Sequence, residues 1–334
     1  MENMESDNYN DNSGKKTGIL LAAITTLLYS ITDLTVYAAS RRSNQFVVYV
    51  FNSTVGCVLC IFYIIIKRPT IECNFNQTVL ATTVIGSLQT LSQFTILFAA
   101  IQIGPGNAMA LYHTMPVFAI ALHALIIGDA IKKFHVILAI VAFAGALLIS
   151  RSYLLGEDWQ APESIPFWDI ITISSALLSA LSQASVVTLR RKWSHFNIDP
   201  CFTTFSFLFQ FSLISIILWA VNKWFWPDSY TDAVMLITSS LATFLASLSL
   251  HKSASLCDPP VVTLVLTFGV VITYAGQIAF FSLPLTWYSL VGAAFIFVSG
   301  VGNALFTIYE ERIPNLVNGN DSKVGEERTS LVNE

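Results

Sequence analysis

The sequence predicts an all-α integral membrane protein of ten transmembrane helices arranged as two inverted five-helix repeats. Of its 334 residues, 54% are hydrophobic and 11% are charged, and the mean hydropathy is +0.64, whereas soluble domains carry about 25% charged residues. Apolar runs of about 20 residues, long enough to cross a bilayer core, occur ten times. Because half of ten is an odd number, a duplicated unit must enter the membrane in opposite directions in its two copies.

The ten expected spans leave only short tails and one loop, so no soluble catalytic domain fits beside them. In order they cover residues 17–37, 45–66, 78–101, 105–127, 134–150, 168–189, 201–221, 230–250, 258–281 and 285–308. The domain organisation follows from this order. We expect an N-terminal tail (1–16), a first repeat (17–150), an extracytoplasmic linker (151–166), a second repeat (167–309) and a C-terminal tail (310–334).

Basic residues are distributed unequally between the two sides of the predicted bundle. With the N-terminus in the cytoplasm, thirteen lysines and arginines fall on the cytoplasmic side and four on the other. This asymmetry predicts that both termini are cytoplasmic. The net charge of −4 arises in the tails, and the nearly neutral body does not form a nucleic-acid footprint. The sequence leaves open whether the membrane is the plasma membrane or an endosomal, Golgi or endoplasmic-reticulum membrane.

The two predicted halves share weak features that fit a repeat. The Gly-Pro-Gly entrance at residues 104–106 into the fourth span is echoed by Asp258-Pro259-Pro260 at the ninth. In each half a short connection then leads to a last span rich in glycine and alanine, whose small residues let helix backbones approach closely.

The motif around Ala108, Pro116 and Gly128-Asp129 resembles a known family. Together with the segments P-V-F, G-D-A-I-K-K-F and A-F-A-G-A-L-L-I, it is similar to the EamA-type repeat of the drug/metabolite transporter superfamily, most of all to the solute carrier family 35 subfamily G branch. The resemblance implies ten helices in two inverted repeats with a substrate cavity between them.

The sequence departs from that family in two places. Asp129 stands where the family commonly has glutamate. The second half lacks both the proline and the acid, and has Phe268-Gly269 and Phe281 at the matching positions. We therefore expect the corresponding helix to kink differently.

The fourth predicted span contains a proline near its middle. Pro116 removes a backbone donor and clashes with the preceding turn, which bends the helix and frees carbonyl groups. Tyr112 and His113 lie one turn before it. Ring, imidazole and opened backbone are therefore expected to converge on a cavity, and the alternative is a structural kink with a satisfied histidine.

Asp33 is the one acid well inside a predicted span. An ionised group there is costly, so such residues usually face a cavity or a partner. Tyr29, Asp33 and Tyr37 share a helix face at spacings of four residues. One interpretation is a substrate anchor or proton carrier, and the other is an acid that reaches water or pairs with Arg41 or Arg42.

Two glutamines of the third span, Gln89 and Gln93, are stacked one turn apart. Amides can bind solute hydroxyls or carboxylates without a fixed charge, but they also hold helices together. The candidate substrate-binding residues are Tyr29, Asp33, Gln89, Gln93, Tyr112, His113 and Pro116.

The sequence predicts a secondary active transporter of a small organic metabolite, for which the resemblance suggests an organic acid, working by alternating access. No G-x-x-x-x-G-K-[ST] motif is present, so a solute or proton gradient would supply the energy. The alternatives are a nucleotide-sugar antiporter of the Golgi or endoplasmic reticulum and a non-transporting membrane adaptor that acts through its tails. The absence of basic residues deep in a span argues against a cationic clamp on a nucleotide.

An enzyme is not expected, because no spacing of serine, histidine and acid marks a nucleophile with its base. Cys57 and Cys60 form a C-x-x-C inside the second span without a second ligand pair, so no metal and no cofactor are expected. The expected partners are a small-molecule solute, the lipid bilayer and a coupling proton, without nucleic acid. A homodimer remains open.

Overall fold

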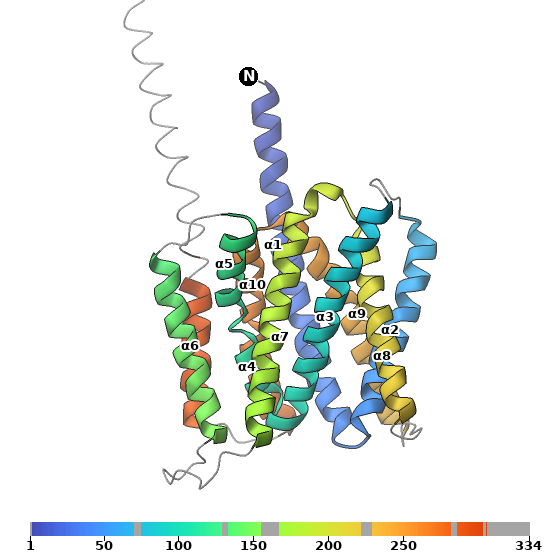
Figure 1. The fold of residues 1–334 in the computed structure, drawn as a ribbon, viewed down its shortest axis with the longest axis vertical. Helices are drawn as coiled ribbons and strands as arrows, with labels where there is room; N and C mark the ends of the chain where they lie inside the picture. Colours follow the sequence, from blue (N-terminus) through green and yellow to red (C-terminus); the bar gives the residue numbers. More distant parts are fainter. Residues whose placement is uncertain are drawn as a thin grey trace, which may run out of the picture.

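The computed structural model describes residues 2–69, 75–128, 133–154, 167–221, 229–281, 286–302 and 305, and every regular element within these ranges is helical (Figure 1). The helices in chain order are α1 (Glu2–Ser40), α2 (Gln45–Lys67), α3 (Phe75–Ile103), α4 (Pro105–Tyr112), α5 (Met115–Ile126), α6 (Lys133–Leu154), α7 (Phe167–Lys192), η1 (Ser194–Phe196), α8 (Pro200–Val221), α9 (Tyr230–Leu256), α10 (Pro259–Thr267), α11 (Gly269–Phe281) and a last helix Trp287–Gly302. Asp129, most of the predicted linker and the C-terminal tail lie outside the described residues.

Eight helical stretches in the described part of the chain are long and apolar enough to cross a membrane. They are Lys16–Ser40, Gln45–Lys67, Phe75–Ile103, Pro105–Ile126, Phe167–Lys192, Pro200–Val221, Tyr230–Leu256 and Pro259–Phe281. The fifth and tenth expected spans correspond to α6 and Trp287–Gly302, which are not among the eight. The count of ten therefore stays a prediction.

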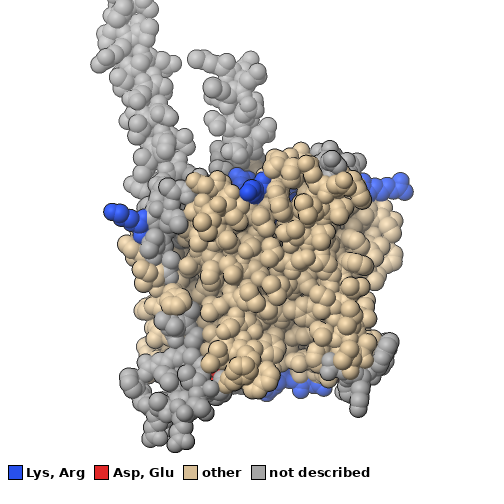
Figure 2. All heavy atoms as spheres, viewed as in Figure 1, with Lys and Arg blue, Asp and Glu red and all other residues tan. Residues whose placement is uncertain are grey.

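The outer surface of the bundle is apolar while its interior contains many hydroxyl groups. Ile66 and Leu125 are each 81% exposed, and Figure 2 shows a broad band without charged side chains between basic residues at the two ends. Buried serines and threonines bond mainly to carbonyls of their own helices, as Thr25 does to Leu21 and Ser30 to Thr26. This distribution suits a lipid-facing exterior and close helix packing inside.

Local sequence explains where the helices begin and end. Asn44 caps α2 by accepting a 2.9 Å hydrogen bond from the Phe46 amide. Ser229 does the same for α9 through the Asp232 amide at 3.2 Å. These side chains satisfy amide groups that have no partner within the helix.

The fourth span is interrupted between α4 and α5. Thr114 donates to the Leu111 carbonyl through both its amide (3.1 Å) and its hydroxyl (2.8 Å), which closes a tight turn. Pro116 stands in the first turn of α5, where its missing amide proton costs nothing. Because Pro116 cannot bond to the Tyr112 carbonyl, the break lies just before the proline, at His113 and Thr114.

The second interruption separates α10 from α11 without a proline. The Phe268 amide bonds to Val265 at 3.2 Å and the Val271 amide to Phe268 at 3.1 Å, so the helix tightens for one turn. The side chain of His113 fills the space beside Gly269, where an added Cβ would lie 3.0 Å from Nε2. The two breaks therefore face each other.

Helices from the two halves of the chain alternate in the bundle. α1 packs on α9, α3 on α7 and α2 on α8, with further contacts of α2 with α9 and α3 with α8. α4 contacts α11 and α5 contacts α10. The two interrupted helices therefore run antiparallel and cross near their breaks.

α6 and the helix Trp287–Gly302 form a pair at one side of the bundle (Figure 1). A Cβ at Gly145 would lie 2.5 Å from the Gly292 carbonyl oxygen, and a Cβ at Gly292 would lie 2.5 Å from that of Gly145. The Ser299 hydroxyl donates to the Leu138 carbonyl at 2.6 Å. Only glycine allows this backbone-to-backbone approach.

Candidate substrate-binding site

Polar side chains of α1, α3 and α9 meet near the middle of the bundle. Gln89 donates from Nε2 to the Tyr29 hydroxyl at 2.9 Å and to the Ser247 hydroxyl at 3.4 Å. Tyr29 and Ser247 are themselves 3.3 Å apart. One amide thus joins three helices, and its Oε1 atom is buried without a partner.

A second group of polar side chains joins α1, α2 and α9. Thr243 donates to Asn52 Oδ1 at 3.0 Å and lies 3.3 Å from the Thr32 hydroxyl. Asn52 Nδ2 is buried and unpartnered. With Asp33 and His113, these two groups form what we call the central polar cluster: Tyr29, Thr32, Asp33, Asn52, Gln89, His113, Thr243 and Ser247.

Asp33 is 3% exposed, and in the part of the chain that the structure describes its Oδ2 atom has no hydrogen-bond partner. Arg41 lies over the Tyr37 ring, 5.7 Å from its centroid, and Arg42 is 3.8 Å from Asp232. In the described part of the chain neither arginine pairs with Asp33. Of the two interpretations of this acid, the ion pair with Arg41 or Arg42 is therefore not formed in this structure.

His113 lies at the crossing of the two interrupted helices. The ring is 2% exposed, and neither nitrogen has a hydrogen-bond partner among the described residues. It meets the Tyr112 ring edge to face with centroids 5.1 Å apart. The alternative of a histidine satisfied by hydrogen bonds is not what the structure contains.

The remaining predicted site residues are also buried but are less directly connected. Gln93 is 6% exposed and lies one turn along α3 from Gln89, and Tyr112 is 7% exposed on α4. Tyr112 interacts electrostatically with Tyr29 and Asp33. Pro116 is buried in the first turn of α5. Whether these residues contact a solute stays a prediction.

The hydroxyl face of α9 contributes to both groups, although none of its residues is among the predicted site residues. Ser239, Thr243 and Ser247 follow one another at spacings of four residues, and Thr243 and Ser247 bond to the polar side chains of Asn52 and Gln89. The spacing can be read from the sequence, but the partners on other helices cannot.

Another polar junction joins the start of α4 to α11. The Gly106 amide donates to Gln277 Oε1 at 2.7 Å, and the Tyr274 hydroxyl donates to Asn107 Oδ1 at 2.9 Å. Gln277 thus satisfies an amide in the first turn of α4. A Cβ at Gly106 would lie 2.5 Å from the Tyr274 ring, so this contact requires glycine.

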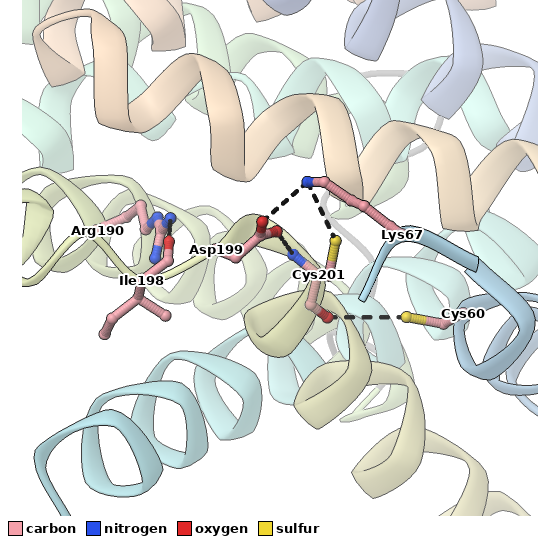
Figure 3. A network of polar contacts seen from close by, with 6 residues as sticks. All are labelled: Cys60, Lys67, Arg190, Ile198, Asp199 and Cys201. Carbon is pink, nitrogen blue, oxygen red and sulfur yellow. Dashed lines mark hydrogen bonds and ion pairs between the residues drawn. The ribbon is translucent and has the colours of Figure 1, made fainter. Parts of the chain in front are cut away.

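Charged groups gather at the end of the bundle that contains the C-terminus of α2 (Figure 3). Lys67 pairs with Asp199 at 2.8 Å, and Asp199 accepts from the Cys201 amide at 2.9 Å. Burial raises the pKa of Asp199, but the hydrogen bonds from Cys201 and Lys67 outweigh it, so the pKa is lowered overall.

Arg190 completes this group, which we call the basic end network: Cys60, Lys67, Arg190, Ile198, Asp199, Cys201, Thr203 and His251. Arg190 is 2% exposed and donates to the carbonyls of Ile198 and His251 and to the Thr203 hydroxyl. The Cys60 thiol donates to the Cys201 carbonyl at 3.7 Å. Among the described residues no three histidines, cysteines or acids are placed to hold a metal.

The sequence is similar to known transporter proteins. Residues 16–151 match the EamA-like transporter family. The pseudopaline exporter CntI of Pseudomonas aeruginosa is 23% identical over 77% of this chain and 84% of its own length. Solute carrier family 35 member G1 of Homo sapiens is 22% identical over 67% of this chain and 62% of its own length.

Several chains of solved structures share the fold, and one of them is from a protein of known crystal structure. It superposes with a TM-score of 0.63 at 13% identity, covering 86% of this chain and 96% of its own. The resemblance of the sequence to the drug/metabolite transporter superfamily and to the subfamily G branch is confirmed by these relatives. The chain is a multi-pass membrane protein whose residues 16–151 form an EamA-like transporter domain.

Proposed function

We propose that this protein is a secondary active transporter of a small organic metabolite, and that it works by alternating access between two inverted five-helix repeats, residues 17–150 and 167–309. The observation that carries the proposal is the pair of facing helix breaks beside the central polar cluster. Transporters commonly bind substrate where interrupted helices present backbone groups and helix ends near the bilayer midplane.

The helix contacts support two related halves. If α1, α2 and α3 correspond to α7, α8 and α9, exchanging the halves turns the α1–α9 contact into α7–α3 and the α2–α9 contact into α8–α3. Both members of each pair are formed. The contact of α1 with α10 and α11 likewise corresponds to that of α7 with α4 and α5. Such exchange is what an inverted repeat requires.

The glycine contact of the last helices fits the same symmetry. Ile296 lies 3.0 Å from a Cβ built at Gly145, and Ile149 lies 2.8 Å from one built at Gly292. Each isoleucine stands four residues after the glycine of its own helix. The local environment is therefore reproduced when the two helices are exchanged, which supports α6 and Trp287–Gly302 as the fifth members of the repeats.

Orientation is the next part of the proposal. Lys67, Arg190 and Arg191 stand in the last turns of α2 and α7, whereas Arg41 and Arg42 follow α1. The larger set of bases would lie in the cytoplasm with both termini. Single reporter cysteines at Asn44 and Ser255, probed with an impermeant maleimide in intact cells, should label only at Asn44. The reverse pattern would contradict this orientation.

Transport is tested with purified protein in liposomes. Counterflow should be measured across organic acids, amino acids, amines and nucleotide sugars, with and without a pH gradient. Gln89→Ala should lower flux about tenfold, because it removes a bond between three helices at the site. Gln210→Ala is the matched control, since Gln210 bonds to Ser87 on the outer part of the α3–α8 contact. The absence of flux for every compound would contradict the transporter.

A proton gradient is proposed as the energy source, with Asp33 as the titrating group. Asp33→Asn should then abolish the stimulation of flux by a pH gradient, measured as the ratio of flux with the gradient to flux at equal pH. If the pH gradient still drives flux in Asp33→Asn, the proton role of this carboxyl is wrong.

A further inference from the structure

Asp33 differs from the other acids of the candidate spans. The described spans contain three acids, and Asp169 and Asp232 stand in first turns of their helices. Asp33 is seven residues from the nearest end of its span and is 3% exposed. An ionised carboxyl group at such a position needs a countercharge.

The described spans provide no fixed countercharge near it. Their lysines and arginines stand in the first or last turns or on the exposed surface: Lys16, Lys67, Arg190, Arg191, Lys192 and Lys252. The two arginines that follow α1 are engaged elsewhere, Arg41 with Tyr37 and Arg42 with Asp232. Among the described residues, therefore, Asp33 has no cationic partner, so its carboxyl group is either neutralised by a proton or complemented by a cation that enters from outside.

A second buried acceptor lies beside the same tyrosine. Gln89 uses its amide nitrogen for Tyr29 and Ser247, so Oε1 faces the interior without a donor. Tyr29 also interacts electrostatically with Asp33, which stands one helical turn further along α1. An unpartnered carboxylate oxygen on α1 and an unpartnered amide oxygen on α3 thus belong to the two helices that the Tyr29 hydroxyl group joins. Both atoms are acceptors, so a ligand that satisfies them must offer N–H or O–H donors, and a protonated amine offers a positive charge as well.

Two tyrosines stand in the same region as Asp33. Tyr29 lies one helical turn before it on α1, and Tyr112 is 7% exposed on α4. Aromatic rings attract cations through their negative faces. An anionic solute would gain nothing from these rings and would be repelled by the carboxylate.

From these observations we infer that Asp33 and Gln89 Oε1 bind a protonated amine of the transported solute. This inference rests on the proposed transport function and narrows its substrate class to amine-bearing metabolites. It also departs from the organic acid suggested by the family resemblance, because an acid without an amine has no countercharge in the described interior.

Matched probes that differ only in charge test the inference. Two triplets are suitable: butylamine, butanol and butyrate, and phenethylamine, 2-phenylethanol and phenylacetate. Each is added to purified wild-type protein, and thermal stabilisation and competition with counterflow are measured. In at least one triplet the amine should bind while its alcohol and carboxylate do not. Equal or stronger binding of the carboxylate, or no binding of either amine, would overturn the inference.

Substitutions assign the binding to Asp33. Asp33→Asn should weaken amine binding at least about tenfold, the scale expected when one charged partner is lost, and Asp33→Glu should restore part of it. Asp169→Asn is the control, because this acid lies at a helix start, and it should bind the amine like wild type. Unchanged amine binding in Asp33→Asn would show that the carboxyl is not the receptor. If Asp33→Asn does not fold, the inference is still tested by whether the wild-type protein binds the amine in preference to its alcohol and carboxylate.

The outcome separates this inference from the proposed function. Flux of neutral or anionic solutes without any amine binding would support the transport function and contradict amine binding at Asp33. Amine binding without flux of any solute would contradict the transport function and support the amine site.

Discussion

The central polar cluster and the basic end network are both buried and polar, yet their charged side chains are paired to different extents. In the end network Arg190 donates to three oxygens and Lys67 pairs with Asp199, although both ring nitrogens of His251 are buried without a partner among the described residues. In the cluster, Asp33 Oδ2 and both nitrogens of His113 have no partner among the described residues. Unsatisfied buried atoms cost about 1–3 kcal/mol each. We therefore expect the paired charges of the end network to stabilise the fold, and the proposed binding role of the cluster to come at the expense of stability.

The largest change in stability is expected when the end network loses its arginine. Arg190→Met keeps the apolar stem but removes three hydrogen bonds, so the free energy of unfolding should fall by about 3 kcal/mol at roughly 1 kcal/mol per bond. Thermal unfolding in detergent measures it. Arg191→Met serves as control, since its ion pair with Asp258 is partly exposed and should cost no more than about 1 kcal/mol. Equal losses of unfolding free energy in Arg190→Met and Arg191→Met would contradict a special stabilising role of Arg190.

In the central polar cluster, by contrast, we expect the loss of a polar side chain to raise the stability of the protein. His113→Leu removes two unpartnered buried nitrogens, so we expect the protein to gain about 1 kcal/mol of stability while transport is lost. Melting temperature and counterflow on the same preparation test both parts. A variant that is less stable than wild type would indicate that the imidazole is satisfied in the membrane.

A smaller loss is expected from Tyr29→Phe. The ring stays in place, but Gln89 and Ser247 lose their shared hydroxyl partner, which should destabilise the protein by about 0.5–1.5 kcal/mol. Tyr63→Phe is a suitable comparison and should be close to neutral, because the Tyr63 ring packs on Phe244 and its hydroxyl group joins no helices in the described part of the chain. If both tyrosines behave alike in unfolding experiments, the three-helix junction does not contribute.

The smallest effect concerns pH. Because the pKa of Asp199 is lowered in the folded protein, its ion pair stabilises the fold above the carboxyl's unfolded pKa of about 3.9 and this contribution is lost as the pH falls through the lower folded value. Since Lys67 is 43% exposed in its side chain, we expect less than about 1 kcal/mol. Melting temperatures between neutral pH and pH of about 3 should fall less steeply in Asp199→Asn than in wild type, and parallel curves would contradict the assignment.

Hydropathy was sufficient for most helix positions. The expected span at 45–66 became Gln45–Lys67, and that at 230–250 became Tyr230–Leu256. The N-terminal tail was predicted as separate from the first span, but α1 begins at Glu2, because hydropathy marks the part that crosses the membrane and not the end of the helix. The break near Pro116 followed from proline chemistry. The break at Phe268 has no such marker and depends on the His113 side chain beside Gly269.

The candidate site was predictable as a set of residues but not as a set of contacts. An acid and two glutamines inside apolar runs stand out in any sequence. The bond from Gln89 to Tyr29 joins positions 60 residues apart, and hydroxyl-rich faces such as that of α9 look the same whether they pack or bind. Pairing between helices depends on their rotation in the bundle, which one sequence does not specify.

The reciprocal approach of Gly145 and Gly292 limits how this protein can change over time. A side chain at either position would press on the carbonyl oxygen of the other, and the partner cannot become smaller to make room because it is already glycine. No second mutation across this contact can therefore rescue a first one, so the two positions are locked together unless the helices themselves move apart.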